Sequence, residues 1–170
     1  MQLFIDESKE RGYHFAIAGV RVSDVQKERA LVRGLLLKGQ SHLHFTKESD
    51  GRRRQILRDL TRESSARCTI LTVPRGVKER QARKMCLEAT VVLGEECGVT
   101  RLVFERDDST LQEDRRVLYP LLHHSDVRYD FMAKREEPLL WIADAIAWCH
   151  TAGGQWKQLA APLVDEVRPI

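Results

Sequence analysis

Short apolar segments alternate with longer amphipathic segments along this chain, and that alternation limits its fold most strongly. Strands are predicted at residues 2–6, 13–22, 67–73, 100–105 and 127–133. Helices are predicted at about 25–38, 51–65, 77–97, 110–123 and 139–151. This order is typical of an α/β protein in which helices cover a sheet. The turn-like residues 9–12 would join the first two strands as an antiparallel hairpin, so we expect a mixed sheet flanked by helices.

Length and composition predict a single domain over residues 1–170, located in the cytoplasm. A chain of 170 residues suits one core, and its hydrophobic content of 42% excludes disorder. No apolar run reaches the roughly 18 residues that a membrane span needs, and the start of the chain does not resemble a signal peptide. The four cysteines are scattered without a Cys-x-x-Cys pair, which favours reduced thiols over a zinc site.

Positive charge is concentrated in one part of the chain. Residues 51–84 contain eleven Lys or Arg and three acids, a balance of +8, whereas the whole chain carries +3. The rest of the chain therefore carries −5, as expected for a basic face beside an acidic site. Within the basic part, Arg54, Arg58 and Arg62 recur every four residues and would share one helix face. That face would either contact phosphates or be an ordinary solvated surface.

Acidic residues follow two of the predicted strands. Asp6 and Glu7 come directly after an apolar run, and Glu105 ends another, with Asp107 just beyond it. Ligands of open α/β sheets gather at the carboxyl ends of the strands. We therefore expect these carboxylates to meet at one edge of the sheet.

Asp144 interrupts an apolar helix, where its neighbours three and four residues away are apolar (Leu140, Trp141, Ala147 and Trp148). Burying a lone carboxylate costs several kcal/mol, so a cation is expected beside it. That cation is either a metal ion or a basic side chain. A divalent ion would also relieve the repulsion among converging carboxylates, and Mg²⁺ prefers such oxygen ligands.

The same segments resemble the family known as domain of unknown function 3800, over roughly residues 1–150. The similarity lies in the opening strand with its Asp-Glu-Ser (residues 3–8), a small-residue second strand (15–20), a His-containing segment (42–45), an acidic-Arg pair (105–106) and a late helix (140–147). Two positions depart from the pattern, since the family's middle strand usually offers Asp and its late helix has Gln at Trp141.

The resemblance implies a ribonuclease-H-like fold and a nuclease-type site in which Asp6, Glu105 and Asp144 face the metal. Because the middle strand departs from the pattern, either Glu105 or Asp107 would be the middle ligand. The leading hypothesis is a nuclease that uses Mg²⁺ or Mn²⁺ and cleaves RNA or DNA. Two ions about 4 Å apart can activate a water and stabilise the leaving oxygen of a phosphodiester. Glu7 or Asp107 would complete the ligand set.

Several basic residues are predicted to assist this site. His44 would help to transfer a proton, as a histidine can near neutral pH. Lys47 would approach the acidic cluster, and Arg106 would contact nucleic acid.

Two other functions fit the same residues. In a non-catalytic module that binds nucleic acid or protein, an arginine such as Arg106 would pair with Asp144 and no metal would be needed. A hydrolase for a small phosphorylated substrate would need an enclosed pocket instead of an open groove. Tryptophans exposed near the C-terminus would suit a homodimer.

Overall fold

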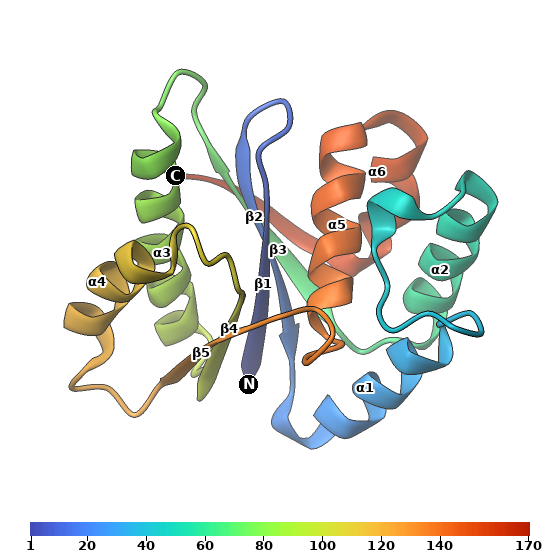
Figure 1. Ribbon diagram of the computed structural model, residues 1–170, viewed down its shortest axis with the longest axis horizontal. Helices are drawn as coiled ribbons and strands as arrows, with labels where there is room; N and C mark the ends of the chain where they lie inside the picture. Colours follow the sequence, from blue (N-terminus) through green and yellow to red (C-terminus); the bar gives the residue numbers. More distant parts are fainter.

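A mixed six-stranded sheet forms the centre of the molecule in a computed structural model, which describes all 170 residues (Figure 1). Its strands are β1 (Gln2–Ser8), β2 (Tyr13–Val20), β3 (Arg67–Val73), β4 (Arg101–Glu105), β5 (Arg128–Met132) and β6 (Val164–Pro169). They lie in the order β5-β4-β1-β2-β3-β6. Only β2 runs against the others, because it pairs antiparallel with both β1 and β3. The predicted hairpin and mixed sheet are confirmed.

Helices cover both faces of this sheet, as Figure 1 shows. They are α1 (Val25–Gly34), α2 (Asp50–Glu63), α3 (Glu79–Glu96), α4 (Leu111–Leu122), α5 (Leu140–Ala152) and α6 (Gly154–Ala160). Three short 3₁₀ helices complete the chain, at Val22–Asp24, Phe45–Lys47 and Ala161–Leu163. The predicted helices and strands are confirmed to within a few residues, whereas α6 and β6 lie in a stretch that the sequence left unassigned. None of the helices combines the length and apolar character needed to cross a bilayer.

Two hydrophobic cores lie on opposite faces of the sheet, and β1 contributes to both. Phe4 packs into the core beneath α1, α2, α5 and α6, while Leu3 and Ile5 pack into the core beneath α3 and α4. This division follows from the period of two along a strand, which sends successive side chains to opposite faces. Residues that follow Ile5 in β1 are therefore directed alternately into the two helical layers.

The tryptophans near the C-terminus lie inside the molecule. Trp141 is 2% exposed and Trp156 is 9% exposed, and Trp148 packs against the same core. The prediction that these tryptophans are exposed is therefore wrong, and the homodimer loses the argument that rested on it.

Two histidines meet between β2 and α5 in a setting that disfavours their charged forms. The rings of His14 and His150 lie 4.9 Å apart, edge to face, and the Nδ1 atoms of both are buried without a hydrogen-bond partner. Burial lowers the pKa of His150 from 6.5 to about 4, helped by His14 and Lys157, and burial also lowers the pKa of His14.

We expect the free energy of unfolding to fall as the pH drops from 6.5 towards 4. These limits are the pKa of a histidine in the unfolded chain, 6.5, and the pKa of His150 in the folded chain, about 4. Over this window the unfolded chain binds more protons than the folded chain. The ring of His150 is partly exposed, so screening should reduce its share to about 1 kcal/mol. Urea denaturation at several pH values would measure this pH dependence of the free energy of unfolding, with His150→Phe as the matched variant. An identical pH dependence in both proteins would contradict the prediction.

Candidate functional site

The carboxyl ends of two adjacent parallel strands bring acidic residues together. β1 pairs with β4 in a register that places Ile5 opposite Phe104, so the next residues, Asp6 and Glu105, follow side by side. Asp144 comes from the second turn of α5, which packs across β1 and β2. Apolar neighbours surround both aspartates because each lies in a segment that is buried in the core.

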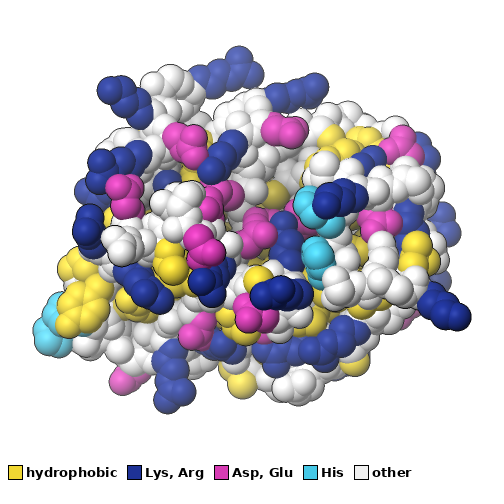
Figure 2. All heavy atoms as spheres, viewed as in Figure 1, with side chains coloured by type: hydrophobic (Ala, Val, Ile, Leu, Met, Phe, Trp, Pro, Cys, Tyr) yellow, Lys and Arg dark blue, Asp and Glu magenta, His cyan; other side chains and the backbone are white.

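The three carboxylates converge on one ammonium group, that of Lys134. Its Nζ lies 2.8 Å from Asp144 Oδ1, 3.0 Å from Asp6 Oδ2 and 3.3 Å from Glu105 Oε1. Lys134 lies in the loop between β5 and α5. Figure 2 shows acidic side chains near the middle of the viewed face, with basic side chains around them. The structure thus joins residues that are more than a hundred positions apart in the sequence.

Burial dominates the electrostatics of this cluster. Asp6 is 3% exposed, and burial raises its pKa well above the usual range, with a further contribution from neighbouring Glu105. Burial alone would lower the pKa of Lys134, but the charges of Asp6, Asp144 and Glu105 raise it. The ammonium therefore stays charged and stabilises carboxylates that would otherwise repel one another.

A short loop before α2 holds Asp144 from the other side. The backbone N–H of Phe45 donates to Asp144 Oδ2 at 2.8 Å. The guanidinium of Arg53 fixes this loop by donating to the carbonyls of Phe45 at 3.0 Å and Thr46 at 2.6 Å. The same guanidinium lies 4.2 Å above the ring of Trp148. Asp144 is thereby tied both to Lys134 and to the loop that carries His44.

His44 lies beside this cluster, as predicted. Burial lowers its pKa, opposed by the charge of Asp144 and reinforced by Lys134. Its Nδ1 is buried without a hydrogen-bond partner. The imidazole is therefore kept in its neutral form, in which one ring nitrogen is free to accept a hydrogen bond. Lys47 follows in the same loop and is exposed.

The oxygens of the cluster suit a hard cation, but their present arrangement suits an ammonium. Asp6 Oδ2 is buried and accepts no hydrogen bond, although it lies within ion-pair distance of Lys134. No group of three or more His, Cys, Asp or Glu side chains is arranged to hold a metal ion. Mg²⁺ would need these oxygens at about 2.1 Å from its centre, closer than the 2.8–3.3 Å at which they surround the Lys134 ammonium. The carboxylate oxygens are therefore of the type that Mg²⁺ or Mn²⁺ prefers. In this structure the Lys134 ammonium lies where such an ion would bind.

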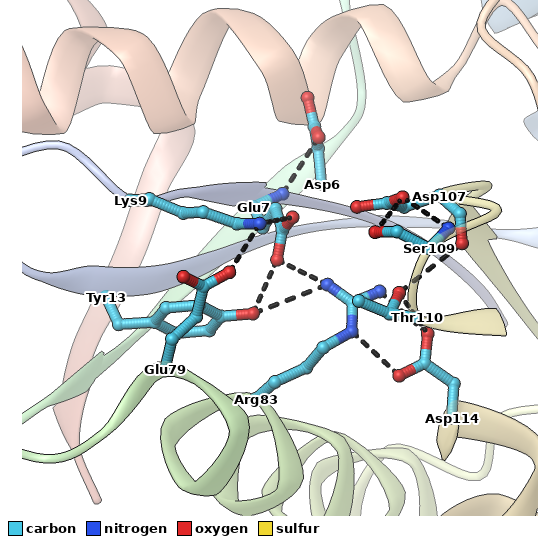
Figure 3. Close-up of polar contacts among 10 residues, drawn as sticks. All are labelled: Asp6, Glu7, Lys9, Tyr13, Glu79, Arg83, Asp107, Ser109, Thr110 and Asp114. Atoms are coloured by element: carbon cyan, nitrogen blue, oxygen red, sulfur yellow. Dashed lines mark hydrogen bonds and ion pairs between the residues drawn. The ribbon is translucent and has the colours of Figure 1, made fainter. Parts of the chain in front are cut away.

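Glu7 points away from this cluster, into the opposite helical layer, as Figure 3 shows. Its Oε2 accepts a hydrogen bond of 2.5 Å from the Tyr13 hydroxyl and another from Arg83. Arg83 also donates twice to Asp114, each time at 2.7 Å. The prediction that Glu7 joins the acidic cluster is not borne out by this geometry, because neighbours in a strand face opposite sides.

The loop after β4 separates Glu105 from the other predicted acids. Asp107 accepts hydrogen bonds from the backbone and hydroxyl of Ser109 at 2.9 and 2.6 Å, which lower its pKa. Of the two candidates for the middle ligand, only Glu105 contacts Lys134. Arg106 pairs with Asp108 at 2.7 Å. The expected pairing of Arg106 with Asp144 is therefore wrong, and Lys134 provides that cation.

A small cleft of about 30 Å³ lies beside Asp6 and Glu105, on the side of the sheet that carries Glu7 and Arg83. Asp144 and Lys134 do not line it. Sites for small molecules usually enclose about 300 Å³ or more. The cleft therefore does not favour the hypothesis of an enclosed pocket for a small phosphorylated substrate.

The predicted arginine face of α2 is exposed. Arg54 donates to Gln155 at 3.4 Å and lies 5.3 Å from the ring of Trp156, and Arg62 pairs with Glu63 at 2.8 Å. The guanidinium of Arg58 makes no ion pair. These side chains lie on the helix that follows the loop of His44, and the contacts of Arg54 are with α6.

Comparisons with known proteins support the fold. No protein-family model matches the sequence, and no curated protein matches it. The solved structure of the complex of PCNA with RNase HII from Archaeoglobus fulgidus is similar, with a TM-score of 0.59 and 21% identity. The similarity covers 89% of this chain and 72% of that one. The chain therefore has an α/β fold of the ribonuclease-H-like kind.

Proposed function

We propose that this protein is a nuclease that depends on Mg²⁺ or Mn²⁺ and hydrolyses phosphodiester bonds of nucleic acid. One observation carries the proposal: the carboxylates of Asp6, Glu105 and Asp144 converge on a single cation, the ammonium of Lys134. Three elements supply these carboxylates, and all reach the edge of the sheet where ligands of α/β proteins gather. The similarity to a solved RNase HII supports the same function.

Three groups of residues have different roles in this proposal. Asp6, Glu105 and Asp144 would hold the metal, which when bound supplies the activation of water and the stabilisation of the leaving oxygen. His44, neutral and next to Asp144, would take up a proton. The exposed arginines of α2 and the basic residues Lys47 and Arg106 would contact phosphates without reading the sequence.

The second candidate is a nucleic-acid-binding module without turnover. The Lys134 ammonium favours it, because a basic side chain already neutralises the acids. Such a module would keep the exposed basic face of α2 and bind phosphates through it.

Cleavage assays separate the two functions. Labelled single-stranded RNA, single-stranded DNA, duplexes and RNA–DNA hybrids would be incubated with the protein in Mg²⁺, Mn²⁺ or EDTA. We expect cleavage of at least one substrate with either metal and none in EDTA, because in the proposed site the bound metal supplies the activation of water and the stabilisation of the leaving oxygen. Salt-sensitive binding without cleavage in any metal would overturn the nuclease proposal and support the binding module.

A further inference from the structure

Lys134 occupies the centre of the acidic cluster as a metal ion would. Its side chain is 12% exposed, and its Nζ contacts one oxygen of each carboxylate. Three carboxylates surround this single ammonium, so the cluster keeps an excess of negative charge. A second positive charge at the same centre would be favoured by the acids and opposed by the ammonium.

The backbone of Lys134 is fixed by hydrogen bonds, while its ammonium is held by a hydrogen bond to Asp144 and ion pairs to Asp6 and Glu105. The carbonyl of Lys134 accepts a hydrogen bond of 2.7 Å from Trp141 Nε1. The carbonyl of the preceding residue, Ala133, accepts from the backbone of Glu136 and Glu137. Glu137 is buried and pairs with Arg29. The long, flexible lysine stem can therefore withdraw its ammonium while the loop and the three carboxylates stay in place.

We infer that Lys134 is an internal counter-cation, which keeps the acidic site assembled before metal binds and leaves when a divalent ion enters. This inference deepens the proposed function and rests on it, because it takes the same three carboxylates as the metal ligands. Lysine and metal then compete for one centre. The competition weakens metal binding, and in exchange it stabilises the metal-free protein.

Metal binding by Lys134→Met tests this competition without any nucleic acid. Methionine keeps an unbranched stem of similar length and removes the charge. Titration with Mn²⁺, followed by electron paramagnetic resonance, should show affinity at least about 10-fold higher than in the wild type. Thermal unfolding in EDTA should occur at a lower temperature in the variant, and Mn²⁺ should restore it.

Two matched variants show whether a gain in Mn²⁺ affinity comes from the position of Lys134 or from the loss of any positive charge. Lys47→Met removes the same charge from the adjacent exposed loop, and Lys134→Arg keeps the charge at the centre. Neither should gain affinity for Mn²⁺. Equal or weaker Mn²⁺ binding by Lys134→Met than by the wild type would overturn the inference, as would an equal gain in Lys47→Met.

A measurement on the unaltered chain covers the case in which Lys134→Met does not fold in EDTA. Acylation of lysines, followed by mass spectrometry, should modify Lys134 slowly in EDTA and several-fold faster with saturating Mn²⁺. An unchanged rate would overturn the inference. The two proposals fail separately, since tight Mn²⁺ binding by the variant without cleavage by the wild type would exclude only the nuclease. Cleavage by the wild type with unchanged Mn²⁺ affinity in the variant would exclude only the role of Lys134.

Discussion

Replacement of Asp6 by asparagine is expected to lower metal-dependent cleavage at least about 100-fold, the scale on which loss of a charged group at a reacting centre acts. The asparagine would keep the shape of the side chain and could still accept the hydrogen bond of 2.8 Å that Asp6 Oδ1 receives from the Glu7 N–H. It would lose the negative charge that Asp6 places beside Lys134. Initial rates on the best substrate, with saturating Mg²⁺ or Mn²⁺, would measure the loss.

The matched control for Asp6→Asn is Asp108→Asn. Asp108 lies in the loop after β4, its side chain is 76% exposed, and its partner is Arg106. The same chemical change there should leave the rate within about two-fold of the wild type, since exposed pairs contribute little. Circular dichroism would show that both variants fold. A wild-type rate in Asp6→Asn would mean that cleavage arises elsewhere or from a contaminant.

Replacement of Arg83 by methionine is expected to lower the free energy of unfolding by about 3–5 kcal/mol, the usual cost of leaving buried charges without their partner. Arg83 makes two hydrogen bonds of 2.7 Å to Asp114 and contacts Glu7 and the Tyr13 hydroxyl (Figure 3). Asp114 is only 1% exposed, so water cannot replace the lost contacts. Urea denaturation monitored by tryptophan fluorescence would give the change.

Arg80→Met provides the comparison for Arg83→Met. Arg80 lies one turn earlier on α3 and pairs with Glu113 at 3.0 Å, but its side chain is 80% exposed. An exposed pair contributes about 0–1 kcal/mol, so this variant should unfold almost as the wild type does. If both variants lost the same stability, burial of the Arg83 network would not be the cause.

Local patterns in the sequence were sufficient for most of the fold. Runs such as residues 3–5 and 102–104 predicted strands because buried strands need continuous apolar segments. The placement of Asp6 and Glu105 followed, because parallel strands end at one edge. The last twenty residues resisted prediction, since β6 alternates exposed and half-buried residues and so carries a weak apolar signal. Its pairing with β3 depends on contacts distant in sequence.

The sequence indicated that Asp6, Glu105 and Asp144 would lie together, but it did not indicate that Lys134 would be the cation between them. Lys134 begins a run of four charged residues (134–137) in a loop that looks like an ordinary solvated turn, and nothing local indicates that its ammonium is buried. The apolar surroundings of Asp144 predicted a positive partner, either a metal ion or a basic side chain, and Arg106 was the example for the non-catalytic alternative. That the basic side chain is Lys134 depends on the path of the chain between β5 and α5, which the sequence does not show. Glu7 could have been excluded earlier, because the period of two in a strand separates it from Asp6.

The two outer strands of the sheet, β5 and β6, leave main-chain groups open to solvent along both edges. Charged side chains interrupt each of them, with Arg128 and Asp130 in β5 and Asp165 and Glu166 in β6. Pro169 ends β6 and offers no N–H. Charges and proline at such edges discourage another chain from extending the sheet. Self-association of this protein through its sheet edges is therefore disfavoured relative to association through its helical surfaces.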